Sequence, residues 1–199
     1  TQRHWEMLKR VARYLKYAPR AVRRFAYQDR LDKLETYVDS DHAGCVRTRK
    51  STSGAVLMLG KSQLRSVCRG QAVIAWSSGE AEYYGLVTGM SESIGEQSVA
   101  MDWGIKLPIV IYMDATAGAA IGSRRGLGKV KHINALFLWA QERVTTGQVR
   151  IVWKHTSINL ADILTKAIEA GKLRTAMEQM GFTFPAGRAS QAYTTDGLG

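Results

Sequence analysis

LETYVDSD, residues 34–41, is the stretch that most strongly indicates the fold of this chain. Its alternation of apolar and polar residues predicts a β-strand that ends in Asp39 and Asp41. A second stretch, KLPIVIYMD (106–114), is a continuous apolar run typical of a strand buried on both faces, and it ends in Asp114. Ligands of open sheets gather beyond the carboxyl ends of parallel strands. If these two strands are parallel neighbours, Asp39 and Asp114 lie close together.

The elements around these strands predict an α/β fold. Two further strands, 51–60 and 62–69, are joined by a tight hairpin at Gly60 and Lys61. A helix begins near Ser78, the expected N-cap, and runs to about Trp103, with a break at Gly89 or Gly95 as an alternative. A small-residue helix is expected after Asp114, and the later elements are helix 132–146, strand 148–155 and helices 159–168 and 172–181. The order predicts a mixed five-stranded sheet, three antiparallel strands followed by parallel strands, flanked by helices.

The charge and cysteine content narrow the class of protein. The 199 residues carry a formal net charge of +11, which favours a polyanionic partner such as nucleic acid over a merely solvated basic surface. Cys45 and Cys68, the two cysteines, lack zinc-ligand spacing and cannot form a disulfide framework. Reduced thiols fit an intracellular protein, in a cytoplasmic particle or the nucleus. No apolar run reaches the roughly 20 residues of a membrane span, so no membrane partner is expected.

The chain divides into three segments. Residues 1–33 hold an amphipathic basic helix over 4–17, and its cationic face either contacts nucleic acid or is simply solvated. We expect residues 34–182 to form the main domain and residues 183–199, which lack periodicity, to form a disordered tail. The absence of an initiator Met indicates a piece of a longer polypeptide.

Four acids in separate elements suggest a metal centre. Asp39 and Asp114 end strands, Glu82 lies in the first turns of a helix, and Asp162 is in a late helix. Converging carboxylates repel one another unless a cation balances them, and Mg²⁺ prefers carboxylate oxygens. Two such ions can activate a water and stabilise a leaving oxygen. His155 suits proton handling or protonation of a leaving group. Each residue alone is more often a turn, helix-end or surface residue, so the hypothesis depends on their joint occurrence.

At these residues the sequence resembles the ribonuclease H domain of copia-type retrotransposon polyproteins, over about residues 35–181. The upstream stretch HWEMLKRVARYLKYAP (4–19) resembles the segment that joins reverse transcriptase to that domain, which makes the reverse transcriptase portion a candidate partner. The blocks that carry the resemblance are YVDSDHAG (37–44), RKSTSGAVLMLG (49–60), AWSSGEAEYYGL (75–86), IYMDATAGAAI (111–121), KVKHINALFLWAQERVTTGQV (129–149) and HTSINLADILTK (155–166).

The resemblance implies a ribonuclease H fold and Mg²⁺-dependent hydrolysis of RNA in RNA–DNA hybrids during reverse transcription. Asp39, Glu82, Asp114 and Asp162 take the positions of the metal ligands, for two Mg²⁺ ions that Mn²⁺ can replace, and His155 takes that of the histidine assisting product release. No small-molecule cofactor is implied. The sequence departs from the family pattern at four positions, none of them a proposed ligand: His42, Cys45, Ala115 and Asn134.

Substrate contacts are predicted around the basic segments, where phosphate contacts position nucleic acid without reading bases. A second basic cluster consists of Arg124, Arg125, Lys129 and Lys131. For this cluster, and for the basic residues at positions 47, 49, 50, 65 and 69, the alternative is a solvated surface. Two other functions remain open: an inactive, repurposed basic scaffold or nucleic-acid-binding subunit, and a strand-transfer enzyme of the integrase type. The predicted substrate-binding residues are Arg47, Arg49, Lys50, Ser51, Arg65, Arg69 and Asn159.

Overall fold

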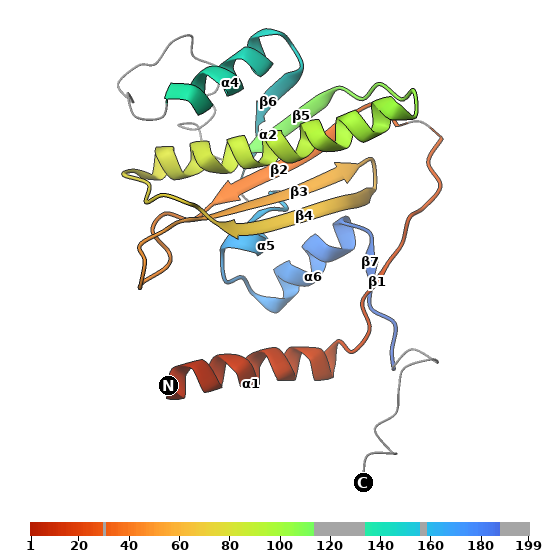
Figure 1. Ribbon diagram of the computed structural model, residues 1–199. Helices are drawn as coiled ribbons and strands as arrows, with labels where there is room; N and C mark the ends of the chain where they lie inside the picture. The colour runs from red at the N-terminus through yellow and green to blue at the C-terminus, as the bar shows by residue number, and fades with distance from the viewer. Residues whose placement is uncertain (30, 114–133, 156–158, 188–199) are drawn as a thin grey trace.

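A five-stranded sheet forms the centre of the molecule (Figure 1). The structure is a computed structural model that describes residues 1–29, 31–113, 134–155 and 159–187. The strand order is β4-β3-β2-β5-β6; β2, β3 and β4 are antiparallel, whereas β5 pairs in parallel with β2 and β6. This confirms the mixed sheet predicted from the sequence. The strands are β2 (Leu34–Ser40), β3 (Thr52–Leu59), β4 (Ser62–Gly70), β5 (Ile109–Met113) and β6 (Val149–Trp153).

Helices cover both faces of the sheet. The long helix α2 (Ser78–Asp102) packs on one face against β2, β3 and β5, while α5 (Asp162–Thr165) packs on the other against β2, β3 and β4 (Figure 1). Helix α4 (Asn134–Thr145) lies beside β6 on the α2 side, and α6 (Ala170–Gln179) follows α5. The sheet is therefore the middle of three layers.

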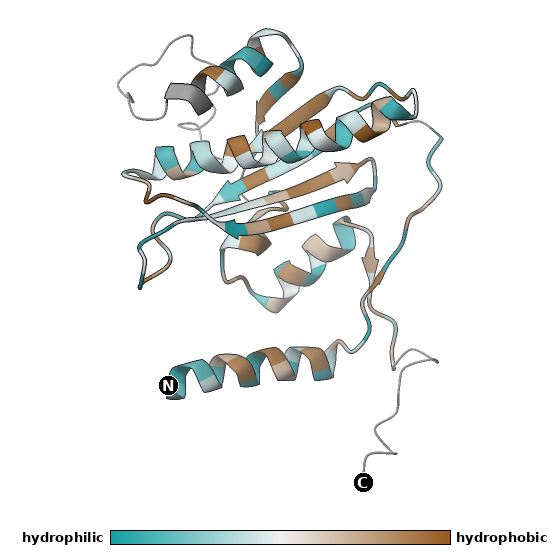
Figure 2. Cartoon of the chain, in the orientation of Figure 1, coloured by the Kyte–Doolittle hydropathy of each residue, from teal (hydrophilic) through white to brown (hydrophobic). Residues whose placement is uncertain are grey.

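Alternation along β3 builds a core on each side of the sheet. Ala55 and Leu57 pack with the cluster under α2, whereas Val56 and Met58 pack with the cluster under α5 and α6. Successive side chains of a strand point to opposite faces, so a strand covered on both sides must be apolar throughout. Figure 2 shows this apolar run in β3. Such two-sided burial makes the sheet a rigid support for groups at its edge.

Helix α2 is continuous through both glycines at which the sequence analysis allowed a break. Gly89 is buried, and a Cβ there would lie 2.2 Å from Val38 Cγ1. The glycine therefore serves close packing of the helix on β2 rather than a kink. The N-cap is Ser77 instead of the predicted Ser78, because the Ser77 hydroxyl accepts the Glu80 amide hydrogen.

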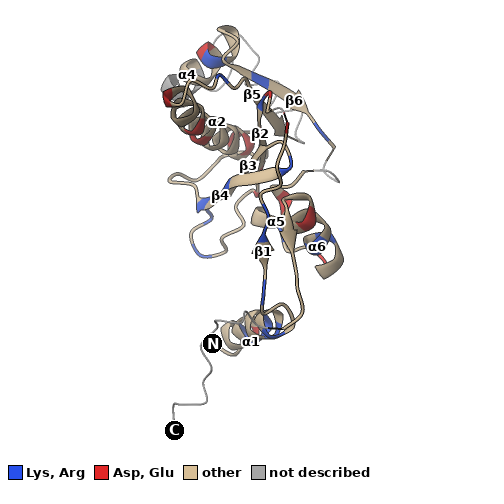
Figure 3. Cartoon of the chain, turned by 90° about the vertical axis from the view of Figure 1, so that its right-hand side faces the viewer, with Lys and Arg blue, Asp and Glu red and all other residues tan. Residues whose placement is uncertain are grey.

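A short two-stranded sheet joins the segment after helix α1 (Gln2–Tyr17) to the segment after helix α6. In it, strand β1 (Val22–Arg23) pairs with β7 (Phe182–Thr183). Thr183, predicted to open a disordered tail, instead pairs with Val22, and residues 188–199 lie outside the described residues. Figure 3 shows Lys and Arg along α1. Among the helices that the structure describes, none combines the length and apolar character needed to cross a membrane.

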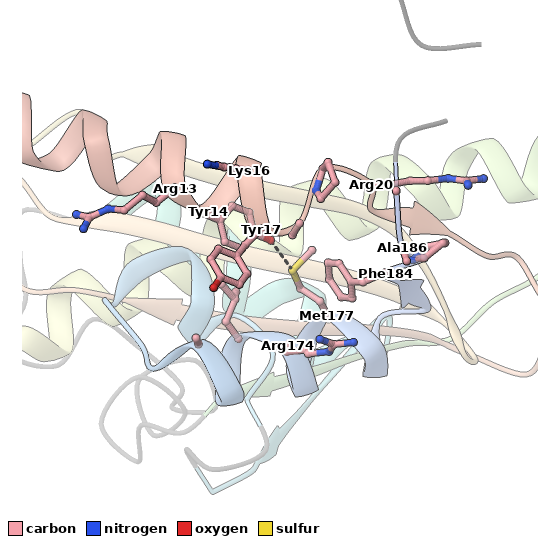
Figure 4. Close-up of a pocket in the computed structure, with 15 residues that line it drawn as sticks. Arg13, Tyr14, Lys16, Tyr17, Arg20, Arg174, Met177, Phe184 and Ala186 are labelled. Atoms are coloured by element: carbon pink, nitrogen blue, oxygen red, sulfur yellow. Dashed lines mark hydrogen bonds between the residues drawn. The ribbon is translucent and has the colours of Figure 1, made fainter. Parts of the chain in front are cut away.

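A cavity of about 700 Å³ lies between the end of α1, helix α6 and the segment after β7 (Figure 4). Tyr14 reaches across it, and its hydroxyl lies 3.7 Å from the sulfur of Met177. Its lining includes neither Asp39 nor Asp162. The cavity is therefore separate from the predicted acidic site.

The predicted helix 159–168 is shorter than expected. Residues 159–161 form a turn, since the Asn159 side chain accepts the Ala161 amide hydrogen, and α5 begins only at Asp162. The small-residue helix predicted after Asp114 falls outside the described residues.

Candidate active site

Asp39 lies near the end of β2 with only 4% of its side chain exposed. The Thr165 hydroxyl donates a hydrogen bond to Asp39 Oδ2, and the Lys166 ammonium lies 3.1 Å from Oδ1. Both donors come from the α5 segment on the far side of the sheet from α2. Two partners thus hold the orientation of the Asp39 carboxylate, which suits a group that must present its oxygens in a fixed direction.

Asp162 begins α5 and is brought to the same place. Lys166 Nζ lies 3.1 Å from Asp162 Oδ1, so one ammonium bridges the carboxylates of Asp39 and Asp162. Partial burial acts to lower the pKa of Lys166, but the charge of Asp39 and the hydrogen bonds to both acids outweigh burial, and the pKa is raised. Two of the predicted ligands, far apart in sequence, therefore share one cationic partner.

Two residues position α5 over the end of β2. The Asn159 amide donates to the Val38 carbonyl oxygen at 2.9 Å, one residue before Asp39. Gly54, the β3 partner of Asp39, leaves room for the helix: a Cβ there would lie 2.9 Å from Thr165 Cγ2. A hydrogen bond and a missing side chain together set how closely α5 approaches Asp39.

Glu82 approaches from the opposite face. A Cβ on Gly85 would lie 3.3 Å from the Asp39 carbonyl oxygen, and Gly89 packs on Val38, so α2 runs antiparallel to β2. Glu82, one turn before Gly85, therefore lies toward the end of β2 that carries Asp39. It is half-buried.

Glu80, the other acid of GEAEYY, has a different role. Its Oε2 accepts the Trp76 amide hydrogen at 2.9 Å, and its own amide donates to Ser77. The Ser77 bond caps the helix, and the Glu80 carboxylate binds the residue before the N-cap, so Glu80 helps to close the start of α2. The geometry thus distinguishes a capping glutamate at 80 from a glutamate at 82 on the helix face that packs on β2.

The remaining predicted site residues are placed less completely. Met113, the last residue of β5, pairs with Val38, which confirms that the strands leading to Asp39 and Asp114 are parallel neighbours. Asp114 itself lies outside the described residues. His155 is exposed two residues after β6, with its ring 6.3 Å from that of Trp153. In the part of the chain that the structure describes, no three His, Cys, Asp or Glu residues are grouped closely enough to hold a metal ion.

Two comparisons with solved structures identify the fold. The N-terminal ribonuclease H domain of Rv2228c from Mycobacterium tuberculosis is 19% identical, covers 74% of this chain and 97% of its own, and has a TM-score of 0.51. LC11-RNase H1, isolated from compost by a metagenomic approach, is 17% identical, with 67% and 93% covered and a TM-score of 0.53. The sheet order and its helices are thus those of the ribonuclease H fold.

Curated relatives identify the lineage. The Retrovirus-related Pol polyprotein from transposon RE2 of Arabidopsis thaliana is 30% identical over 185 residues, 91% of this chain. That from transposon TNT 1-94 of Nicotiana tabacum is 27% identical over 180 residues, 89% of this chain. The chain is a ribonuclease H-fold relative of copia-type retrotransposon Pol polyproteins. It spans 13% of the length of each of these two polyproteins, and no protein-family model matches it.

The predicted phosphate-binding arginines of this ribonuclease H-fold chain differ in their surroundings. Arg65 and Arg69, on β4, form ion pairs with Glu92 of α2, and Arg65 also lies 3.7 Å from Glu96. Their charge is therefore partly balanced within the protein. The loop between β2 and β3 carries Arg47, Arg49 and Lys50, with Arg47 and Arg49 exposed. This loop is the more available of the two basic segments, and phosphate contact by either stays a prediction.

Two predicted substrate-binding residues prove to be buried. Ser51 is 1% exposed, and its hydroxyl accepts the Ala43 amide hydrogen at 3.0 Å, which closes the loop after β2. Asn159 is 6% exposed and uses both ends of its amide on Val38 and Ala161. Both side chains support the site from inside the protein, a role that their polarity alone did not indicate.

Lys166 and Thr165 were missed in the sequence. The signal for Lys166 was its position four residues after Asp162, where oppositely charged side chains on a helix meet. Its second contact, with Asp39, joins residues that the chain order gives no reason to pair. Only the tertiary packing of α5 on β2 reveals it.

Proposed function

We propose that this chain is a divalent-metal-dependent endonuclease that hydrolyses the RNA strand of RNA–DNA hybrids during retrotransposon reverse transcription. The observation that carries the proposal is the convergence of Asp39 and Asp162 on one cationic partner, at the end of a central strand of a ribonuclease H fold. Similarity to Pol polyproteins supports the setting, with the reverse transcriptase portion as partner. An intracellular location is part of the proposal.

The donor set fits a hard divalent cation. Asp39 and Asp162 offer carboxylate oxygens that are already arranged around a positive charge, and such oxygens suit Mg²⁺, with Mn²⁺ as a substitute. Glu82 and Asp114 are the further proposed ligands. Two bound ions would supply an activated water and stabilisation of the departing 3′ oxygen.

The protein's own groups orient and support this chemistry. Thr165 and the burial of Asp39 fix the direction in which that carboxylate faces. His155, exposed beyond β6, can reach a product and carry a proton. The loop with Arg47 and Arg49 provides cations for phosphates, which position a hybrid irrespective of base sequence. Discrimination of RNA from DNA requires contact with the 2′-hydroxyl.

The test is cleavage of end-labelled substrates by the purified chain. An RNA–DNA hybrid, duplex RNA and duplex DNA are incubated with Mg²⁺, Mn²⁺ or EDTA. We expect the RNA strand of the hybrid to be cut when either metal is present and to stay intact in EDTA. Cleavage of duplex DNA instead would favour the strand-transfer class, and no cleavage of hybrid in either metal would favour an inactive scaffold.

Isosteric variants link the activity to the site. Asp39→Asn and Asp114→Asn should each lower the cleavage rate by about 100-fold or more, since several kcal/mol of transition-state stabilisation is lost. Asp102→Asn, at the exposed end of α2, is the matched control and should keep wild-type activity. Full activity in Asp39→Asn alone would exclude Asp39 from the mechanism, whereas full activity in both variants would indicate a contaminating nuclease.

A further inference from the structure

Lys166 occupies the space between the two carboxylates proposed as metal ligands. Its Nζ lies 3.1 Å from both Asp39 Oδ1 and Asp162 Oδ1. The lysine side chain is 42% exposed, whereas those of Asp39 and Asp162 are 4% and 17% exposed. The ammonium therefore covers the acids from the solvent side, where a metal ion would approach.

A positive charge at this position is needed whenever the metal is absent. Two largely buried carboxylates that can touch one ammonium repel each other, and such repulsion favours protonation or separation. Lys166 removes that cost. A divalent cation on the same oxygens would remove it too, but the cation and the ammonium would then repel each other at short range. The two positive groups are thus alternatives.

We propose that Lys166 is a resident counter-ion that competes with the divalent metal for Asp39 and Asp162 and withdraws from them when the metal binds. The inference depends on the proposed metal site. The side chain is able to leave because Lys166 is the C-cap of α5, with extended backbone, and nearly half of it already faces solvent. Thr165 keeps its separate hydrogen bond to Asp39 Oδ2, so the carboxylate stays oriented when Lys166 moves.

If Lys166 has this role, removing its charge should lower the stability of the metal-free protein and raise its affinity for metal. In Lys166→Met, the metal-free protein loses its counter-ion and becomes less stable, yet the metal binds more tightly because its competitor is gone. If the role of Lys166 were purely structural, its replacement would lower both the stability of the protein and its affinity for metal. A lysine that only contacts substrate would leave metal affinity unchanged.

Isothermal titration calorimetry with Mg²⁺ and Mn²⁺ measures the affinity directly. We expect the dissociation constant of Lys166→Met to fall by about tenfold or more, the effect of removing one nearby charge from a partly buried site. Lys166→Arg keeps the charge and should not show this gain. Lys33→Met is the matched control, because Lys33 forms a 2.9 Å ion pair with Glu35 at the start of β2, the strand that carries Asp39. Thermal unfolding in EDTA should show a lower melting temperature for Lys166→Met than for the wild type. Saturating metal should reduce this difference in melting temperature.

A second measurement uses the wild-type chain and does not depend on a variant that folds. Amine-reactive labelling read by mass spectrometry should rise severalfold at Lys166 when Mg²⁺ is added and stay constant at Lys33. If the wild type binds metal, but labelling of Lys166 does not change and Lys166→Met binds no more tightly, the counter-ion role is wrong and the metal site stands. If neither wild type nor any variant binds Mg²⁺ or Mn²⁺, both the inference and the proposed function fail.

Discussion

The side-chain amide of Asn159 donates a hydrogen bond to the carbonyl oxygen of Val38, at 2.9 Å. Val38 immediately precedes Asp39 on β2, and Asn159 begins the turn that leads into α5 at Asp162. This single contact joins the segments that carry the two acids. The side-chain oxygen Oδ1 of Asn159 also accepts the Ala161 amide hydrogen, so the same side chain shapes the turn and attaches it to the strand.

Replacement of Asn159 by alanine should destabilise the fold. The change leaves a buried carbonyl of Val38 without its donor, which costs about 1–3 kcal/mol in the free energy of unfolding. Urea denaturation followed by circular dichroism measures it. Thr146→Ala is a suitable control, since that exposed hydroxyl donates to the Glu142 carbonyl oxygen of α4 and its loss should cost little. Equal stability of Asn159→Ala and wild type would show that the amide does not hold α5 in place.

The two glycines within α2 should respond in opposite ways to alanine. Gly89→Ala places a methyl group against the stiff side chain of Val38, and such overpacking costs about 1–3 kcal/mol. Gly95 is exposed with open space around it, so Gly95→Ala should raise stability by roughly 0.5–1 kcal/mol through helix propensity. Thermal unfolding of the pair tests this. A Gly89→Ala protein as stable as Gly95→Ala would contradict the packing of α2 on β2.

Periodicity and turn residues were enough to predict most of the fold. The alternation in 34–41, the apolar run before Asp114 and the hairpin glycine at 60 led to the observed strands and to their mixed order. The ends of elements were harder to predict, because side-chain contacts decide them. In the sequence Gly89 suggests a helix break, whereas in the structure it packs on Val38. Thr183 suggests the start of a disordered tail, whereas in the structure it pairs with Val22 of β1.

Replacement of Glu80 should affect mainly stability, and replacement of Glu82 should affect mainly activity. Glu80→Gln keeps an acceptor oxygen for the Trp76 amide but loses the negative charge in the first turn of α2, so it should cost about 0.3–1 kcal/mol of stability while cleavage of the hybrid continues. Glu82→Gln should lower the cleavage rate by about 100-fold or more with little loss of stability, as expected for a lost metal ligand. Paired unfolding and cleavage assays of both variants decide the matter. The reverse pattern would assign the ligand to Glu80.

The site was only partly predictable for a physical reason. Acids that follow an apolar or alternating run can be recognised from sequence, because such a run indicates a strand and ligands gather beyond the carboxyl ends of parallel strands. Lys166 pairs with Asp39 across the packed layers, and Ser51 is buried by the closure of its own loop. Such contacts follow from how elements pack, which residue spacing does not encode.

The stability of the fold should decline at high pH through Tyr83. This side chain is completely buried, and burial raises its pKa far above the ordinary value of 10.0. The unfolded chain loses the phenolic proton near pH 10 while the folded protein keeps it. The stabilisation is thus complete below pH 10 and is lost as pH rises above it toward the folded pKa. Denaturation between pH 8 and about 11 should show a slope that Tyr83→Phe reduces and Tyr27→Phe, at an exposed position, leaves intact. An unchanged slope in Tyr83→Phe would locate the effect in other groups.

A crystal structure of the chain grown with Mn²⁺ and measured for anomalous scattering would show directly whether the two acids hold metal. We expect an anomalous peak in contact with the carboxylates of Asp39 and Asp162, with the Lys166 ammonium moved away from both. Crystals at saturating Mn²⁺ with no peak there, and with Lys166 still bridging the two acids, would contradict this expectation.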